Sequence, residues 1–457
     1  MKYHLVGIAG SGMSALAQLI RRVGHEVSGS DRSFDRGQAT EVRDALVSLG
    51  IKIFPQDGSG VEDQTHRVIF STAVEKDNTD LAKALEHNIP LVRRAKLVAE
   101  LFDKRFGIAI SGTSGKSTVA GMIATMLRAL GMDPTFYGGA GLAGVDGPPA
   151  LANAMAGGGD FFCAETDESD GSFLEFHPKI TVVTNISKDH KSLEEITGLF
   201  LRFMEQTEKT LVLNADCPVT RGFKLPAKET IWFGCDAKRF PLVIKQQSIE
   251  GTAIEWKGIP CYVRPAGIHN VSNALATLTM AEVLKIPLAE AARGLETYRG
   301  IHRRLELVRK TKGIWVFDDF AHNPVKIEAT LTTLQSFFPR VLAVFQLHGF
   351  GPARAMKEEL AQLFSRMLRK DDRLLLPEIY DVGGTADRSI RTEHVVEAIL
   401  KIRKDAPVLY ARREEIPDHI GRNAKPGGAV VVMGARDPSL PELCRQIIKV
   451  AAPLLSG

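Results

Sequence analysis

Hydrophobic and polar positions follow the same order at three places in the chain. Each place has an apolar run, a turn of glycine or small residues, and then a helical pattern. The apolar runs cover residues 3–9, 107–110 and 313–317. Helices are expected over residues 13–23, from Ser117 onward, and after Pro324. This order is typical of parallel sheets with crossover helices, so the sequence predicts an α/β fold.

The length of the chain predicts several domains. A chain of 457 residues exceeds what one compact core usually holds. A helical stretch over residues 95–103 and a turn at 298–300 mark the expected junctions. The predicted domains are residues 1–103, 104–299 and 300–457.

Two further features complete the expected organisation. Apolar runs at residues 340–345 and 429–433 predict two more strands in the last domain. The Gly/Ala-rich segment 138–159 is expected to be a flexible surface connection rather than an element.

The composition is that of an ordinary water-soluble protein. Hydrophobic residues make up 44% and charged residues 25%, and 58 basic residues face 54 acidic ones, so no strong field attracts nucleic acid or a membrane. No apolar stretch approaches the ~20 residues that span a bilayer. The N-terminal run also lacks the basic region and cleavage site of a signal peptide. We therefore expect a cytoplasmic protein, a monomer or homodimer, that acts on small molecules.

The cysteines support the same compartment. Five cysteines are scattered along the chain, and none form a CxxC pair. This spacing suits neither a zinc knuckle nor a disulfide framework, so reduced thiols are expected.

A glycine-rich loop follows the first apolar run. Its residues, which we call the glycine loop, are Gly10, Ser11, Gly12, Met13 and Ser14, and Asp31 ends the next predicted strand. Glycines let the backbone approach a diphosphate, the helix N-terminus attracts its charge, and a carboxylate can bind a ribose hydroxyl. Alone, this pattern predicts a dinucleotide cofactor and a dehydrogenase, but any nucleotide diphosphate, or a plain tight turn, satisfies it.

A second loop follows the run at 107–110. Its residues, which we call the phosphate loop, are Gly112, Thr113, Ser114, Gly115, Lys116, Ser117 and Thr118. They form a shortened Walker-type motif, with Ile110 where the full motif has glycine. Lys116 can reach the β- and γ-phosphates of ATP, and the Ser117 hydroxyl can ligate Mg²⁺. A dehydrogenase has no use for this loop and a simple ATPase has no use for the first, so the pair narrows the choice of function.

Carboxylates and a histidine follow two further apolar runs. The run at 161–164 leads into Glu165, Asp167, Glu168 and Asp170, and the run at 180–185 leads to Asp189 and His190. Because parallel sheets place ligand sites at strand C-termini, these groups are expected to converge beside the ATP phosphates. Oxygen ligands suit Mg²⁺ or Mn²⁺, so His190 is the less expected ligand.

Taken together, these residues resemble the Mur ligase family, which adds amino acids to the muramyl precursor of bacterial peptidoglycan. The resemblance runs almost end to end, through several motifs in the order of the family. The motifs lie at residues 6–14, 164–174, 184–185, 189–190, 267–274, 303–306 and 318–324. Within the family, the chain is most similar to the branch that joins L-alanine to UDP-N-acetylmuramate.

The resemblance implies a fold and a set of roles. It implies a Rossmann-like N-terminal domain for the UDP-sugar, a central P-loop ATPase-like domain with a mostly parallel sheet, and a Rossmann-like C-terminal domain for the amino acid. The glycine loop would hold uridine diphosphate rather than NAD, with Asp31, Ser71, Thr72 and Ala73 nearby. The phosphate loop would bind ATP together with Asn270, Asn273, Arg304 and Asp319.

Further roles concern the chemistry. Ser117 and Glu165 would ligate one metal ion and His190 a second. Catalytic contributions would come from Lys116, Arg304, His190 and His322. His348 and Arg354 would face the incoming amino acid.

The implied reaction forms an amide during peptidoglycan synthesis, the cell-wall biogenesis on which bacterial shape and division depend. The lactyl carboxylate attacks the γ-phosphate of ATP, and the amine of the amino acid then displaces phosphate from the acyl phosphate. Lys116, Arg304 and the cations would stabilise the phosphoryl oxygens. Because Arg304 and Lys116 belong to different domains, the resemblance implies domain closure.

Some positions depart from the alanine-adding pattern. Phe320 replaces a tyrosine, Arg354 alone remains of an arginine-rich stretch, and Lys191 and Ser192 follow His190 where the family has an aspartate. Lost cationic partners change which acceptor a pocket accepts. The acceptor therefore stays open between L-alanine, another small amino acid and the tripeptide L-Ala-γ-D-Glu-meso-diaminopimelate of a recycling ligase. An NAD-dependent oxidoreductase and a nucleotide-binding regulatory protein are the alternatives from other classes.

Overall fold

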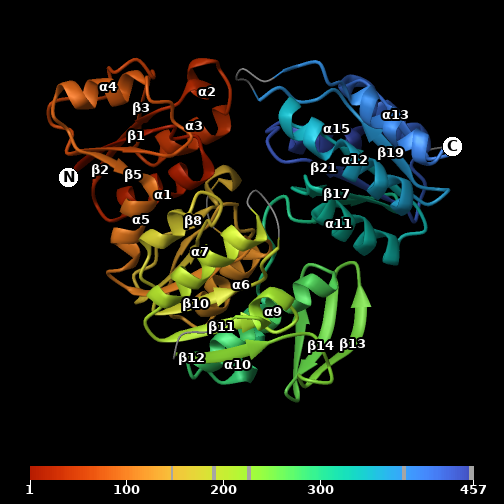
Figure 1. The fold of residues 1–457 in the computed structure, drawn as a ribbon, viewed down its shortest axis with the longest axis horizontal. Coiled ribbons are helices and arrows are strands. Elements are labelled where there is room, and N and C mark those ends of the chain that lie inside the picture. Colours follow the sequence, from red (N-terminus) through yellow and green to blue (C-terminus); the bar gives the residue numbers. More distant parts are fainter. Residues whose placement is uncertain (146–147, 188–191, 224–227, 383–386, 452–457) are drawn as a thin grey trace. The chain divides into compact units, whose positions relative to one another are not determined.

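The computed structural model describes residues 1–145, 148–187, 192–223, 228–382 and 387–451. Contacts divide the chain into two compact units, Met1–His302 and Arg303–Gly457. The three largest sheets are mostly parallel and lie among helices, which confirms the predicted α/β fold class (Figure 1).

The first sheet has five parallel strands in the order β3-β2-β1-β4-β5. The strands are β1 (Lys2–Val6), β2 (Glu26–Ser30), β3 (Lys52–Phe54), β4 (Arg67–Phe70) and β5 (Leu91–Arg93). Its helices are α1 (Ser11–Arg22), α2 (Arg32–Asp35), α3 (Thr40–Ser48), α4 (Thr79–Glu86) and α5 (Arg94–Phe102). The first strand was expected to reach residue 9, but it ends at Val6 because Gly7, with φ 76°, turns the chain.

The second sheet has seven strands in the order β12-β11-β10-β6-β9-β7-β8. They are β6 (Phe106–Ser111), β7 (Thr135–Tyr137), β8 (Ala154–Met155), β9 (Phe161–Glu165), β10 (Ile180–Val183), β11 (Thr210–Asn214) and β12 (Glu229–Phe233). All pairs are parallel except β7 with β8. The accompanying helices are α6 (Lys116–Ala129), α7 (Leu193–Gln206), α8 (Pro218–Arg221), α9 (Ile268–Val283) and α10 (Leu288–Glu296), with 3₁₀ turns η1 (Pro149–Leu151) and η2 (Ser172–Glu175).

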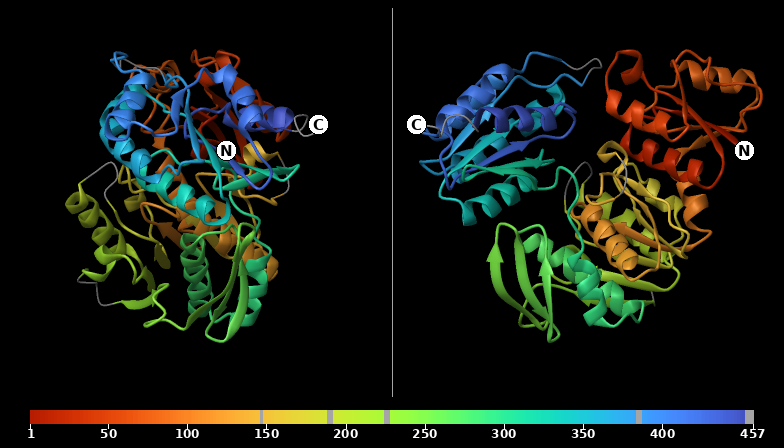
Figure 2. Two further views of the ribbon diagram at one scale, coloured as in Figure 1. Left: turned by 90° about the vertical axis from the view of Figure 1, so that its right-hand side faces the viewer. Right: turned by 180° about the vertical axis from the view of Figure 1, so that it is seen from behind.

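A small antiparallel sheet, absent from the sequence prediction, follows the second sheet. Its strands are β13 (Leu242–Ser248), β14 (Gly251–Trp256) and β15 (Ile259–Val263). Figure 2 shows it as a separate green layer beside the helices of the central region. Trp256 is buried at 1% exposure, so this sheet packs into the core through β14.

The Gly/Ala-rich segment 138–159 is not a surface connection, contrary to the prediction. It contains η1 and β8, and Leu142, Leu151 and Asn153 in it are buried. The segment returns to pair with β7, so its small residues fit against other backbone. A Cβ on Gly157 or Gly159 would collide with backbone of residues 132–134, which explains the glycines.

The helix predicted to bridge two domains is α5. The ring of Phe102, at its end, packs edge-on against Phe162 and Phe176, with ring centroids 5.4 and 5.3 Å apart. One continuous hydrophobic cluster runs from α1 through α5 into the second sheet. The first two sheets therefore share a core within one unit.

The unit that begins at Arg303 is built on a six-stranded sheet in the order β16-β17-β21-β18-β19-β20. Its strands are β16 (Glu306–Thr311), β17 (Ile314–Asp319), β18 (Val341–Phe345), β19 (Arg373–Leu376), β20 (Val408–Tyr410) and β21 (Ala429–Met433). Only β16 pairs antiparallel among these described strands. Its helices are α11 (Pro324–Phe337), α12 (Phe350–Met367), α13 (Thr392–Ile402), α14 (Ile416–Asn423) and α15 (Leu440–Ala451), with the 3₁₀ turn η3 (Arg413–Glu415).

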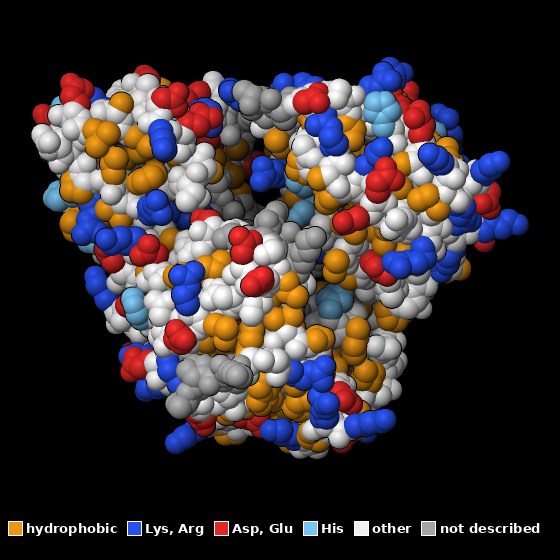
Figure 3. All heavy atoms as spheres, viewed as in Figure 1, with side chains coloured by type: hydrophobic (Ala, Val, Ile, Leu, Met, Phe, Trp, Pro, Cys, Tyr) orange, Lys and Arg blue, Asp and Glu red, His pale blue; other side chains and the backbone are white. Residues whose placement is uncertain are grey.

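The surface agrees with the balanced composition. Basic and acidic side chains are interspersed over the face that Figure 3 shows. Among the described residues, no helix combines the length and the apolar character needed to cross a membrane. The cysteines are unpaired, and four of the five are buried.

Candidate active site

The glycine loop lies at the C-terminal end of β1 and opens α1. The Gly10 amide donates to the Gly7 carbonyl at 3.1 Å, which closes a tight turn. Asp31 supports this turn, because its carboxylate accepts from the Ala9 amide at 2.9 Å and from the Ser33 amide at 2.8 Å. The N-terminal amides of α1 are thereby presented at the strand end, as an anion site requires.

Two side chains from the second sheet hold the glycine loop from its other side. The Tyr137 hydroxyl donates to the Gly12 carbonyl at 3.1 Å. The side-chain amide of Asn153 donates to the Ser11 carbonyl at 2.5 Å and to the Ser14 hydroxyl at 3.0 Å. Tyr137 and Asn153 are 7% and 4% exposed, so the loop rests on buried polar groups.

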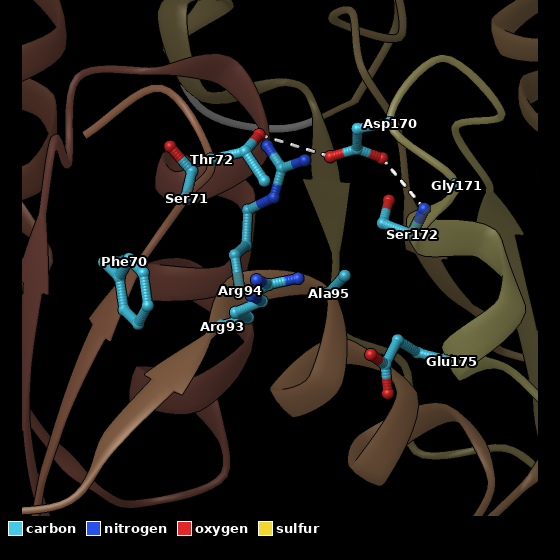
Figure 4. A pocket seen from close by; sticks show the side chains of 10 residues that line it. All are labelled: Phe70, Ser71, Thr72, Arg93, Arg94, Ala95, Asp170, Gly171, Ser172 and Glu175. Atoms are coloured by element: carbon cyan, nitrogen blue, oxygen red, sulfur yellow. Dashed lines mark hydrogen bonds between the residues drawn. The ribbon is translucent and has the colours of Figure 1, made fainter. Parts of the chain in front are cut away.

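A pocket lies beside the glycine loop, between the first and second sheets. It is lined by Phe70, Ser71, Thr72, Arg93, Arg94, Ala95, Asp170, Gly171, Ser172 and Glu175 (Figure 4). The Thr72 hydroxyl donates to the Asp170 carboxylate at 3.3 Å, joining the two sides of the pocket. The structure thus brings Ser71 and Thr72, two candidate sugar-nucleotide residues, into a cavity.

The phosphate loop connects β6 to α6, as predicted, and is held by the end of β10. The Asn185 side-chain oxygen accepts from the Thr113 hydroxyl at 2.7 Å and from the Ser114 amide at 3.1 Å. Gly112 and Gly115 have φ of 136° and 85°, which side chains other than glycine rarely adopt. A Cβ on Gly112 would also overlap the Thr184 hydroxyl, so the loop fits only as glycine here.

Lys116 forms a buried ion pair at the start of α6. Its Nζ lies 2.6 Å from Glu168 Oε2, with side chains 14% and 5% exposed. Burial opposes the charge on Lys116, but Glu168, Glu165 and Asp167 outweigh burial and raise the pKa of Lys116. Burial raises the pKa of Glu168, and Lys116 opposes that rise. The ammonium group is therefore retained in its charged form beside the loop.

The metal-binding candidates Ser117 and Glu165 fit a hard divalent cation. Ser117 is in the first turn of α6, and Glu165 ends β9 directly beside β6, opposite Ile110. Glu165 Oε2 accepts from the Gly139 amide at 2.8 Å, which fixes the carboxylate while leaving further lone pairs. A hydroxyl and a carboxylate are oxygen donors of the type Mg²⁺ prefers. Within the described residues, no cluster of three or more His, Cys, Asp or Glu is arranged around a metal position.

The adenine candidates Asn270 and Asn273 lie at the start of α9. The side-chain amide of Asn273 donates to the side-chain oxygen of Asn270 at 3.2 Å, and both residues are buried. A Cβ on Gly115 would come within 2.7 Å of Asn273 Oδ1, so Asn273 lies directly against the phosphate loop.

Candidates of the other unit gather at the C-terminal end of β17. Asp319 is 7% exposed, accepts from the Ala321 amide and the Thr330 hydroxyl, and has its pKa raised by burial. Arg304 lies over the Phe320 ring, with 4.9 Å between the guanidinium carbon and the ring centroid. The rings of His322 and His348 are 5.7 Å apart. This unit therefore brings an arginine, an aspartate and two histidines to one sheet end.

Models of known protein families match three successive regions of the chain. A model described as the Mur ligase family catalytic domain matches residues 2–106, the Mur ligase middle domain matches 110–281, and the Mur ligase glutamate ligase domain matches 303–436. UDP-N-acetylmuramate–L-alanine ligase of Geotalea uraniireducens is 33% identical, over 95% of both chains. The chain belongs to the Mur ligase family.

Other similar proteins belong to the same family. The enzyme of the same name from Burkholderia pseudomallei is 33% identical, over 94% of both chains. The solved UDP-N-acetylmuramate–alanine ligase MurC of Thermotoga maritima is 26% identical, with 98% of each chain covered and a TM-score of 0.79. A murein peptide ligase of Psychrobacter arcticus shares the fold at 21% identity, over 100% of both chains, with a TM-score of 0.68.

Two candidates stand apart from these clusters. His190, with Asp189 and Lys191, lies outside the described residues. Arg354 donates to the Asp387 carboxylate at 2.7 Å and to the Ser389 hydroxyl at 3.1 Å. Its role toward an amino acid stays a prediction.

Several residues of this Mur ligase site carried no sequence signal. Tyr137, Asn153 and Arg94 belong to no phosphate-binding motif, and they reach the glycine loop only because β7, β8 and α5 fold against it. Glu168 was visible as part of an acidic run, but its pairing with Lys116 was not.

Proposed function

We propose that this Mur ligase joins an amino acid, L-alanine in the first instance, to the lactyl carboxylate of UDP-N-acetylmuramate, with ATP as the energy source. The relatives at 33% identity carry that activity in their names. The reaction would take place in the cytoplasm, as a step in peptidoglycan precursor synthesis.

One observation carries the proposal: Tyr137 joins the glycine loop to the strand end that carries Glu165. Its hydroxyl donates to Gly12 in the glycine loop. On β7, Tyr137 pairs with Ala164, the neighbour of Glu165 at the end of β9. Burial raises the pKa of Tyr137, Arg94 opposes this rise, and Glu165 and Asp167 add to it. Because β9 also pairs with β6, which leads into the phosphate loop, a carboxylate carried by a nucleotide at the glycine loop would be directed toward a γ-phosphate at the phosphate loop. A ligase requires this arrangement and an oxidoreductase does not.

The proposed roles follow from chemistry. Lys116 would bind phosphoryl oxygens, whose charge grows as the carboxylate attacks. A divalent cation held by Ser117 and Glu165 would supply further positive charge there. Asn270 and Asn273 would contact the nucleoside end of ATP. Arg304 keeps its predicted role at the γ-phosphate.

The neutral His322 is suited to accept a hydrogen bond from the amine in this scheme. Its Nδ1 lies 2.8 Å from the Phe320 carbonyl oxygen, which can only accept, so Nδ1 carries the proton and Nε2 is left as an acceptor. Burial, with the charge of Lys326, lowers the pKa of His322 to about 3. We propose that His322 and His348 approach the amine of the amino acid.

A recycling ligase that adds the tripeptide is the second candidate. The observation that favours it is Phe320, which replaces the usual tyrosine and is stacked by Arg303 and Arg304, with guanidinium carbons 5.3 and 4.9 Å from the ring centroid. A ring without a hydroxyl offers the acceptor no hydrogen bond, so it changes the acceptor pocket.

The test is phosphate release with ATP, Mg²⁺ and UDP-N-acetylmuramate, scanned across amino acids and the tripeptide. Release with L-alanine alone supports the proposal, and release with the tripeptide alone supports the recycling ligase. Lys116→Ala should reduce kcat by at least about 100-fold, because one preorganised charge contributes that much to transition-state stabilisation. Lys104→Ala removes an exposed lysine and should turn over normally. Absence of release with every acceptor would refute the proposal.

A further inference from the structure

Arg94, the first residue of α5, lies against the glycine loop. A Cβ on Gly12 would overlap its guanidinium group and come within 2.8 Å of Cζ. The missing side chain of Gly12 therefore makes room for a cation as well as for a ligand. Arg94 also lines the pocket that contains Ser71 and Thr72 (Figure 4).

The guanidinium group of Arg94 is not engaged by other side chains or backbone groups in the part of the protein that the structure describes. Among the residues that the structure describes, it has no hydrogen-bond or ion-pair partner, although the side chain is half-buried. The nearby carboxylate of Asp170 is instead held by the Ser172 amide at 2.9 Å and the Thr72 hydroxyl at 3.3 Å. Burial raises the pKa of Asp170, but these hydrogen bonds and then the charge of Arg94 outweigh it and lower that pKa. Asp170 is thus engaged elsewhere, and Arg94 keeps its donors.

The position of Arg94 is unfavourable for the helix that carries it. Arg93, Arg94 and Lys96 crowd the start of α5, and no acidic residue lies in its first turn. Cations at a helix N-terminus oppose the helix dipole, whereas an anion there is stabilised. Since α5 is fixed by Leu97, Val98 and Phe102 in the shared core, Arg94 is held in place despite this cost.

We propose that Arg94 binds the diphosphate of the sugar nucleotide, together with the N-terminal amides of α1. This inference rests on the proposed function and adds a binding residue to it. A helix N-terminus offers only about half a positive charge, whereas a diphosphate ester carries about two negative charges. The planar fork of an arginine supplies a full charge and two parallel donors to phosphate oxygens. The bound diphosphate would also place a negative charge at the N-terminus of α5, where the chain itself has only cations.

The test is the affinity of the full-length protein for UDP and for UDP-N-acetylmuramate, measured by calorimetry. Arg94→Ala should weaken both ligands by the same factor, roughly 10- to 100-fold, because a charge-assisted hydrogen bond to the diphosphate is common to the two. Arg94→Lys should recover part of the loss, since it keeps the charge but not the fork. Lys96→Ala removes an exposed charge nearby on the same helix and should bind like the parent.

Two results would overturn the inference. One is an unchanged affinity for UDP in Arg94→Ala. The other is a loss confined to UDP-N-acetylmuramate, which would assign Arg94 to the sugar or its carboxylate. If the parent protein itself bound neither ligand, the proposed function would fail instead, so the two failures are distinguishable. A normal melting temperature for Arg94→Ala confirms that the variant is folded.

Discussion

At the scale of single residues, the pair of Lys116 and Glu168 shows how the site balances burial against charge. Nζ and Oε2 are 2.6 Å apart and almost out of contact with water. A buried ion pair adds little net stability, but removing one partner leaves an uncompensated charge. Phosphate oxygens can replace a carboxylate as the partner of an ammonium group, so under the proposed role of Lys116, ATP and Glu168 would be alternative partners for it.

The first prediction concerns Glu168→Gln. The unliganded variant should melt at a lower temperature than the parent, because a buried ammonium without its partner costs ~3 kcal/mol. ATP with Mg²⁺ should raise the melting temperature of the variant more than that of the parent, since phosphate restores the missing negative charge. Asp160→Asn removes an exposed carboxylate just before β9 and should show the parental ATP shift. Equal ATP shifts in Glu168→Gln and the parent would contradict this account.

The second prediction concerns acid stability and His322. Burial lowers the pKa of His322 to about 3, with Lys326 adding to the effect, whereas an unfolded histidine titrates near ~6.5. Between these values the unfolded chain binds a proton that the folded chain does not, so stability is lost as pH falls from ~6.5 toward ~3. His322→Asn keeps a polar side chain without this titration.

The measurement is the melting temperature at about pH 7 and about pH 4.5. The fall between them should be smaller in His322→Asn than in the parent. His66→Asn, at an exposed position, should show the parental fall. An identical fall in His322→Asn would mean that His322 does not contribute to acid unfolding.

At this scale, the sequence reveals those site residues that lie next to one another in the chain. Lys116 and Ser117 could be predicted because the residues of a phosphate-binding motif follow one another in the chain. Glu165 could be predicted as a candidate because it ends an apolar run. Arg94 and Asn153 contact the glycine loop through one or two atoms each and lie far along the chain from it, so only the fold reveals them.

At the scale of elements, the segment between β7 and β9 shows where composition misleads. Its glycine and alanine content suggested a surface connection. In the structure, the small residues let η1 and β8 pack closely, and Asn153 between them contacts the glycine loop. Short elements of small residues have no hydrophobic period to read. The longer predicted elements β6, β9, α6, β18 and β21 lie where the apolar pattern placed them.

The third prediction concerns Asn153→Ala. It removes the buried donor to Ser11 and Ser14, so the glycine loop should lose its support and the KM for UDP-N-acetylmuramate should rise ~10-fold. The KM for ATP should change much less, because the phosphate loop is held by Asn185. Gln18→Ala removes the bonds from Gln18 to Asn153, 2.9 Å long, and to the Ser14 carbonyl, 3.3 Å long. It keeps both donors of Asn153 in place and is the matched control. Parallel rises in both KM values would point to general unfolding rather than a loosened loop.

At the scale of the whole molecule, the repeated strand–turn–helix order predicted parallel sheets correctly but not their strand orders. Order depends on pairing between distant segments, such as β6 between β9 and β10, which periodicity does not encode. The antiparallel sheet β13–β15 was missed for a related reason. Its edge strand, β13, is largely exposed, so no apolar run marks it.

The division into two units leads to the last prediction. The glycine loop, the pocket and Arg94 all belong to Met1–His302, so UDP alone should stabilise that unit. A ligand that binds only the folded form of a unit raises its opening free energy, and amide exchange slows there first. Peptides that cover residues 7–14 and 91–97 should gain protection on addition of UDP, whereas peptides from residues 314–345 should exchange as before. Arg94→Ala, at the same UDP concentration, should lose the protection of 7–14. Equal protection across both units in the parent would show that UDP acts on the whole chain and not through this loop.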